Sequence, residues 1–102
     1  MNGVRELKLL LDIPVGDTEH DELLLALLEH AAAYAKAYCH TDAPDEFLSS
    51  VIVRMAAEDY GALGAAGLDR RSFSGLSENY RPSYSGRIIA ALRSRRKPGV
   101  IG

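Results

Sequence analysis

APDEFLSSVIVRMAAEDYGALG, residues 43–64, is the strongest helical signal in the chain, and the rest of the expected fold is built around it. Pro44 is predicted to take the first helical position, where its missing amide N–H costs nothing, and two acidic residues follow in the first turn. Asp59 is a polar exception on an otherwise apolar face, and Gly64 or Gly67 is expected to adopt the left-handed conformation that ends a helix. The apolar residues recur with the period of one helix face: Leu48, Val51, Ile52, Met55, Ala56 and Leu63.

A second long helix is expected before this one, over DELLLALLEHAAAYAKAYC and ending at about Cys39. At its start, Thr18 and Asp21 resemble a capping box in which the acidic residue is shortened. Its apolar stripe also follows the helical period: Leu24, Leu27, Leu28, Ala31, Tyr34 and Tyr38. Two long helices that each have one apolar face, joined by a short turn, predict an antiparallel helical hairpin.

Two short helices are expected to pack across this hairpin. The first covers about Val4 to Leu11, and the second runs from about Tyr84 to Arg96 with Pro98–Gly99 as its stop. No segment shows convincing strand alternation, so the predicted fold class is all-α. We expect a small four-helix bundle, with a single helical domain over residues 1–97 and a flexible tail at 98–102. The core is predicted to centre on Leu24, Leu28, Ala31, Ile52, Met55 and Leu92.

The segment GLDRRSFSGLSENYRPSYSG, residues 67–86, shows no sustained periodicity and is predicted to be a long Ser/Gly-rich loop before the last helix. A loop of this length without secondary structure is uncommon unless it is functional or disordered. Its scattered apolar side chains are more than a plain linker needs. They therefore need something to pack against.

The residues that could carry chemistry form no catalytic or metal-binding pattern. His20, His30 and His40 have a regular spacing, but ten residues place the first two about 80° apart around a helix, which does not suit a zinc site. Cys39 is the only cysteine, so no internal disulfide is possible and a buried thiol is expected. No nucleophile or phosphate-binding motif is present. We therefore expect neither an enzyme nor a bound cofactor or metal.

The composition is that of a globular protein rather than a membrane protein. The apolar fraction is 47% and the charged fraction 25%, both ordinary for soluble domains. No apolar run approaches the ~18 residues of a membrane span. The start MNGVRELKLLLD carries charges within its apolar run and does not resemble a signal peptide.

Acidic and basic residues are divided along the chain. Residues 1–69 hold 13 acidic and four basic residues, a net charge of −9, whereas residues 70–102 hold one acidic and eight basic residues, a net charge of +7. Such asymmetry suggests that one end meets an acidic partner or nucleic acid. The basic cluster GRIIAALRSRRKPG is open to two interpretations. It grips phosphate or an acidic protein surface, or it is a solvated helix face whose cations complement the C-terminal dipole.

Four segments taken in order resemble a known family: LKLLLDIP, DELLLALLEHAAAYAKAY, APDEFLSSVIVRMAAEDY and GAAGLDRRSFSGLSENY. They are similar to the tailed-phage head–tail connector, or adaptor, proteins over roughly residues 5–95. The most specific part is the third helix leading into G-x-x-G-L and then S-x-S-G-L-S-x-x-Y, a Ser/Gly-rich segment that closes on an aromatic residue. The tail KPGVIG matches no motif of the family.

The resemblance implies a small helical protein that assembles, typically as twelve copies, into a ring beneath the portal. Such a ring extends the channel through which DNA leaves the capsid and presents a surface to the next connector or tail-completion protein. The implied partners are other copies of the chain and the portal, while DNA passes through without specific binding. The implied location is the head–tail junction of the virion, after synthesis in the cytoplasm of the bacterial host.

Under this resemblance, residues 67–84 become an interaction segment that orders on assembly. The candidate subunit-interface residues are Gly67, Leu68, Phe73, Gly75, Leu76, Tyr80 and Tyr84. The alternative is that these side chains fold back on their own bundle. The basic helix would face an acidic portal surface, with docking candidates Arg87, Arg93, Arg95, Arg96 and Lys97. Acidic surfaces elsewhere would repel phosphate and keep the duplex sliding.

A competing hypothesis is a small helical DNA-binding or packaging accessory protein that uses the basic C-terminal helix. A helix-turn-helix protein joins its two helices by three or four residues. Here a predicted loop of roughly 20 residues precedes the basic helix, which argues against that motif.

Overall fold

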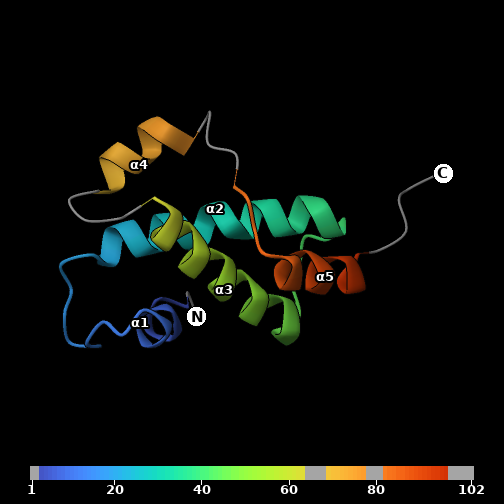
Figure 1. Ribbon diagram of the computed structural model, residues 1–102, viewed down its shortest axis with the longest axis horizontal. Helices are drawn as coiled ribbons and strands as arrows, with labels where there is room; N and C mark the ends of the chain where they lie inside the picture. The colour runs from blue at the N-terminus through green and yellow to red at the C-terminus, as the bar shows by residue number, and fades with distance from the viewer. Residues whose placement is uncertain (1–2, 64–68, 78–81, 97–102) are drawn as a thin grey trace.

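The structure is a computed structural model in which residues 3–63, 69–77 and 82–96 are described. Within these ranges the protein is entirely helical and contains no strand, so the predicted all-α class is confirmed. The elements in order are α1 (Val4–Leu10), α2 (Asp21–Cys39), α3 (Glu46–Ala62), α4 (Arg70–Ser77) and α5 (Gly86–Arg95). Helices α2 and α3 form the centre, and the other three pack against them (Figure 1).

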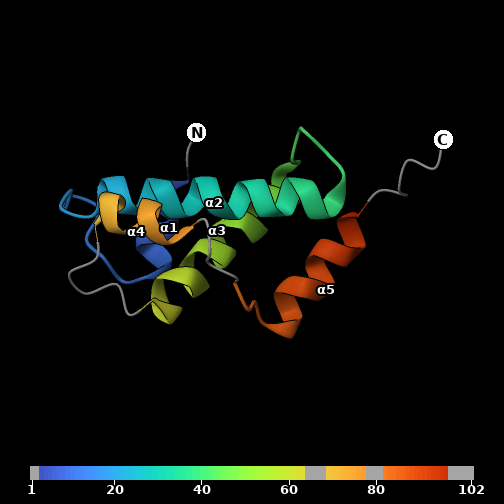
Figure 2. The same cartoon turned by 90° about the horizontal axis from the view of Figure 1, so that it is seen from above.

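The central pair is the antiparallel hairpin expected from the two long apolar stripes, and Figure 2 shows α3 crossing beside α2. His40 takes a left-handed conformation, with φ 56°, at the end of α2. The side chain of Asp45 then caps α3, because its Oδ1 accepts the N–H of Leu48 at 2.8 Å. Pro44 was predicted to be the first helical residue. That boundary is wrong by two positions because Asp45 caps the helix and Glu46 begins it.

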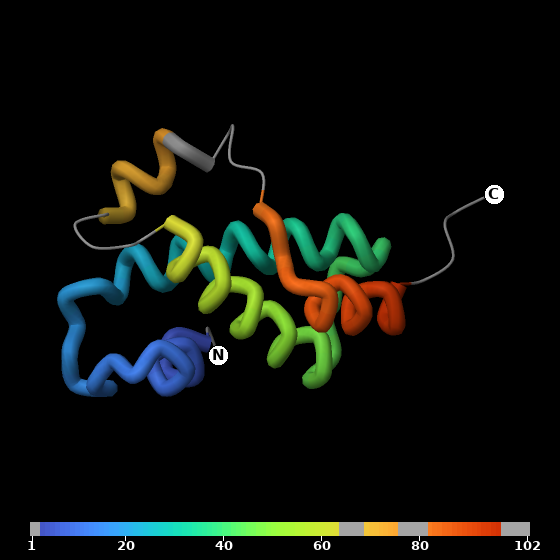
Figure 3. The backbone as a smooth tube through the Cα atoms, in the orientation of Figure 1, coloured from blue at the N-terminus to red at the C-terminus, as the bar shows by residue number. Residues whose placement is uncertain are grey.

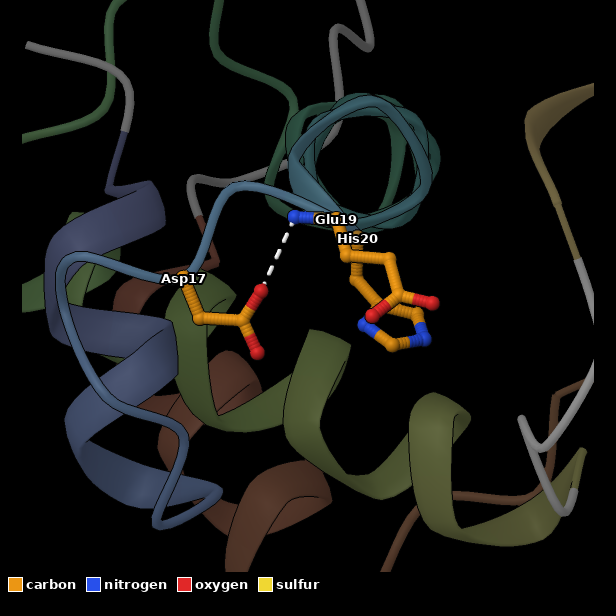
Figure 4. Close-up of side chains that lie close together, drawn as sticks. All are labelled: Asp17, Glu19 and His20. Carbon is orange, nitrogen blue, oxygen red and sulfur yellow. Dashed lines mark hydrogen bonds between the residues drawn. The ribbon is translucent and has the colours of Figure 1, made fainter.

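The predicted capping box at the start of α2 is also wrong. Helix α2 begins at Asp21 after His20, and no side chain caps it. The carboxylate of Asp17 instead accepts the N–H of Glu19 at 3.0 Å, a local turn before the helix (Figure 4). Asp21 pairs with Lys8 of α1 at 2.6 Å rather than with Thr18. A tertiary ion pair therefore takes the acidic residue that a local cap would have used.

The predicted core is confirmed. All six residues named for it are at most 7% exposed: Leu24, Leu28, Ala31, Ile52, Met55 and Leu92. Leu7 from α1 and Phe73 from α4 join the same cluster, so every helix contributes to one core. Its apolar surface supplies most of the stability of a domain this size.

Helix α4 lies where a loop was predicted, which makes five helices in the described residues instead of four. Asp69 caps it, since Oδ1 accepts the N–H of Ser72 at 2.7 Å. Phe73 is 2% exposed and anchors the helix against α2, beside which α4 lies in Figures 1 and 3. One cap and one buried aromatic residue thus make a helix that is too short for periodicity to reveal.

Helix α5 is held to α3 by polar contacts at its start. The hydroxyl of Tyr84 donates to Asp59 Oδ2 at 2.9 Å, in a buried contact. The N–H and hydroxyl of Ser85 donate to the two oxygens of Glu58 at 2.8 and 2.7 Å. The predicted start at Tyr84 is two residues early, because Ser85 is the N-cap and Gly86 begins the helix. Asp59, the polar exception on α3, is thereby explained as the acceptor of this junction.

Candidate functional site

Among the described residues, the side chains that could carry out catalysis or bind a metal are either unreactive or lie apart from one another. Cys39 is fully buried and its thiol donates to the carbonyl oxygen of Leu92 at 3.3 Å. Burial raises the pKa of the Cys39 thiol above its ordinary value, which disfavours the nucleophilic thiolate. The expected buried thiol is confirmed.

Asp17, Glu19 and His20 are one cluster that could approach a metal ion, with candidate ligand atoms within 4.8 Å of one another. Asp17 and His20 are half-buried and Glu19 is exposed. Figure 4 shows the Asp17 carboxylate turned to the backbone of Glu19, whose N–H it accepts. His30 lies elsewhere, with its ring edge-on to Phe73 at 5.5 Å between centroids. The cluster lies on the surface and carries no assignment to a metal.

The arginines of α5 divide into two groups. Arg95 lies 3.4 Å from Asp45 Oδ2, and its guanidinium is 4.5 Å from the centroid of the Phe47 ring. Arg96 approaches His40 Nε2 at 3.4 Å and lies over the ring of Tyr38 at 5.3 Å. Both therefore hold the end of α5 against the turn between α2 and α3, by ion pairing and cation–π attraction.

Arg87 and Arg93 are also exposed and take part in none of these contacts. All four arginines remain accessible, since even the paired Arg95 keeps 45% of its side chain exposed. Lys97, the fifth docking candidate, lies outside the described residues. The structure therefore brings the basic residues to one short helix at the end of the hairpin (Figure 1).

Two candidates for the subunit interface belong to the core of their own chain. Phe73 is 2% exposed against α2, and Tyr84 is 9% exposed, with its ring 5.2 Å from that of Tyr34. For these two, the alternative of folding back on the bundle holds. Gly75 is exposed on α4 with open space around it. The remaining candidates lie outside the described residues or have side chains outside them: Gly67, Leu68, Leu76 and Tyr80.

The comparison with family models decides the class of protein. The model described as "Phage gp6-like head-tail connector protein" matches residues 1–93, which include α1 to α4 and most of α5. The chain belongs to this family. No curated protein and no solved structure gives a significant match.

This connector is therefore a structural phage protein of the head–tail junction, from a family that is not a family of enzymes. The match covers nearly the same residues as the resemblance found in the sequence, and the expected family is confirmed. In the described part of the chain, no helix has the length and hydropathy needed to cross a bilayer.

Sequence reasoning missed the polar residues that join the connector's helices. Lys8 is 3% exposed, and its ammonium donates to the carbonyl oxygen of Val15 at 3.1 Å and pairs with Asp21. Glu58 likewise accepts both hydrogen bonds from Ser85. The only signal for Lys8 was its place beside the apolar stripe of the first helix, where a charge requires a partner if it is buried.

Proposed function

We propose that this connector forms an oligomeric ring between the portal and the tail or next connector protein, and that the ring extends the DNA channel. The family match over residues 1–93 carries the proposal. Within residues 3–63, 69–77 and 82–96, the exposed arginines of α5 and the exposed Leu9 and Leu10 of α1 form charged and apolar surfaces suited to protein partners. The copies, the portal and a tail-completion protein are the partners proposed.

The distribution of charge supports this assignment. The segment up to residue 69 has a net charge of −9, and the segment after it has a net charge of +7. A channel that passes DNA must not bind phosphate tightly, and acidic residues reduce such binding by repulsion. The arginines of α5 would then meet acidic groups of the portal, where the planar guanidinium pairs with carboxylates in two-pronged contacts.

The alternative of a DNA-binding accessory protein gains less support from the same helix. Arg95 and Arg96 are held by Asp45 and His40 of their own chain, and Asp45 adds an acidic group to that surface. A phosphate there would meet a carboxylate at close range. An acidic protein surface would face the same carboxylate, so the preference for a protein partner rests on the family match.

The residue 67–84 segment is proposed to complete the subunit interface through its exposed side, which includes Gly75. Helix α4 presents Ser72, Ser74 and Gly75 outward while Phe73 holds it to α2. Small side chains of this kind allow the backbone of a neighbour to approach closely. The bundle therefore already orders α4 of this segment, and the ring would bury its exposed side.

Charge reversal on α5 tests portal docking. The variant Arg87→Glu with Arg93→Glu should keep its stability within about 0.5 kcal/mol, because both side chains are exposed. It should lose attachment to portal-bearing capsids, measured by co-sedimentation. The matched control is Arg54→Glu, an exposed arginine of α3, which should attach normally.

The same preparations separate the two functions. Electron microscopy of capsids carrying wild-type protein should show a ring at the portal vertex. Wild-type protein should not retain double-stranded DNA at physiological salt in an electrophoretic assay, whereas a DNA-binding protein would do so, and its binding would fall steeply with added salt. Normal attachment of the double reversal would remove α5 from the docking surface.

A further inference from the structure

An unfilled apolar groove lies between α2 and α3. Its volume is about 400 Å³, compared with roughly 150 Å³ for a cavity that holds benzene, so it has room for two branched aliphatic side chains. Its walls are mainly apolar: Leu25, Leu28, Ala32, Ile52 and Val53. Two charged residues of α2, Glu29 and Lys36, stand along its edge. We call this the α2–α3 groove.

Helix α1 carries two leucines that the chain leaves in solvent. Leu9 is 65% exposed and Leu10 is 55% exposed, the highest values among the large apolar side chains described. Both lie on a helix whose other face is buried by Leu7 at 0% exposure. Adjacent exposed leucines are unfavourable in water unless a partner covers them. We call them the leucine pair.

One charge beside the leucine pair complements a charge beside the groove. Arg5 and Leu9 are four residues apart and share one side of α1, and Arg5 is exposed. On α2, Glu29, Ala32 and Lys36 lie along one side in the same way. Arg5 and Glu29 are therefore opposite charges that each lie about one helical turn from the apolar side chains proposed to meet. Asp12 takes no part in this match, because α1 ends at Leu10 and Asp12 is a turn residue with φ 60°.

We propose that the leucine pair of one copy of this chain occupies the α2–α3 groove of the next copy. With α1 parallel to the neighbour's α2, Arg5 lies beside the neighbour's Glu29. The reverse orientation would bring Arg5 toward the neighbour's Lys36, a like charge. Leucine burial drives the contact, and the Arg5–Glu29 pair at its edge sets its direction. Glu29 also faces Arg70 of its own chain at 3.9 Å, but both side chains are at least half exposed and accessible to a second cation.

The two surfaces belong to different elements, which determines the kind of assembly. Each copy would use its leucine pair on one neighbour and its groove on the other, a head-to-tail contact that closes into a ring or continues as a filament. The inference deepens the proposed function, on which it rests, by naming the contact that would build the ring. It adds α1 and the hairpin to an interface that sequence reasoning had placed only at residues 67–84.

Disulfide trapping tests the contact directly, because a disulfide requires the two Cα atoms to come within about 7 Å. Variants that each add one cysteine, Leu9→Cys and Ala32→Cys, should give a covalent dimer when mixed and oxidised, and a chain that carries both should give a ladder of oligomers. Native Cys39 is buried and serves as the background in every sample. The matched control is Phe47→Cys with Ala32→Cys, since Phe47 is also an exposed apolar residue, at 41%.

Four further variants separate the apolar and ionic contributions. The variant Leu9→Ser with Leu10→Ser should weaken self-association, measured by sedimentation, by about tenfold or more. Arg5→Glu and Glu29→Arg should each weaken self-association about two- to fivefold, and the chain with both changes should recover it. Recovery of self-association in the chain with both changes would show that each single change disrupts the contact and not the fold.

Trapping no stronger than in the Phe47→Cys control would overturn the proposal. Trapping of Ala32→Cys by Ile101→Cys in place of Leu9→Cys would assign the groove to the C-terminal tail and would overturn it equally. If trapping fails while wild-type protein still forms rings on portal-bearing capsids, the proposed function stands with a different interface. A ladder without attachment to such capsids would support the contact and reject the portal role.

Discussion

Removing Asp21 should destabilise the connector more than removing Lys8, although the two residues form one ion pair. The Lys8 side chain is 4% exposed, whereas that of Asp21 is 40% exposed, with 2.6 Å between the charged atoms. Asp21→Asn leaves a buried ammonium whose remaining described acceptor is the Val15 carbonyl oxygen. Lys8→Met leaves a carboxylate that is 40% exposed, although its Oδ1 atom is buried. The burial of the charged residue that is left without its partner therefore determines how much stability each substitution loses.

The magnitudes follow from this asymmetry. Breaking a fully buried pair costs about 3–5 kcal/mol, and the partial exposure of Asp21 reduces that figure to about 2–4 kcal/mol for Asp21→Asn. Loss of an acidic group from the first turn of α2 contributes about 0.3–1 kcal/mol in the same direction. Lys8→Met keeps an apolar stem in the core and should cost only about 1–2 kcal/mol.

Urea denaturation followed by circular dichroism gives both free energies of unfolding. For a domain of about 100 residues each kcal/mol shifts the melting temperature by roughly 4–8 °C. In a thermal scan the melting temperature of Asp21→Asn should therefore fall by at least about 8 °C. Glu22→Gln, an exposed neighbour in the same turn, is the control and should change little. Equal costs below about 0.5 kcal/mol for both variants, or a larger cost for Lys8→Met, would refute the reasoning.

Three other outcomes are expected. Ile52→Ala should lower the free energy of unfolding by about 2–5 kcal/mol, because Ile52 is 7% exposed in the core; a loss under about 0.5 kcal/mol would mean that it is not packed. The hydrogen bond from the N–H of Ser72 lowers the pKa of Asp69, so its stabilisation of α4 is complete above the unfolded pKa and is lost as pH falls through the folded pKa. Protection of the α4 amides, taken as the ratio of intrinsic to observed exchange rate, should therefore fall in acid, and Asp69→Asn should blunt that fall. Burial raises the pKa of Cys39, so the native protein should resist alkylation and lose stability as pH rises through the folded pKa of the thiol; rapid labelling at neutral pH would contradict this.

The long helices and the core were predictable because each buries one continuous face. Eleven or more residues with a consistent period outweigh single polar exceptions such as Asp59, and five of the six confirmed core residues came from that pattern, the sixth being Leu92 of the shorter α5. The boundaries were less predictable, because Asp45 and Ser85 each compete with a neighbouring residue for the cap. The end of α2 at Cys39 was placed correctly by the change of pattern after it.

Helix α4 and the joining residues could not be read from local sequence. One buried aromatic residue, Phe73, holds α4, and its partner surface is provided by α2 about forty residues earlier in the chain. Lys8 and Glu58 look like ordinary surface charges until the fold brings Asp21 and Ser85 to them. The arginines proposed for portal docking were recognisable as a cluster, but their division into two groups depends on the position of Asp45 in space.

The joints of the bundle have a consequence for assembly. Lys8 fixes α1, which presents the leucine pair, and Asp59 with Glu58 fixes the start of α5, which presents the arginines. Association costs less when the contacting elements are already ordered. These polar contacts would therefore act at a distance from the proposed interfaces, since they keep in place two short helices that would be marginal alone. It follows that Lys8→Met should weaken ring formation at temperatures where the bundle is still folded, although it changes neither Leu9 nor Leu10.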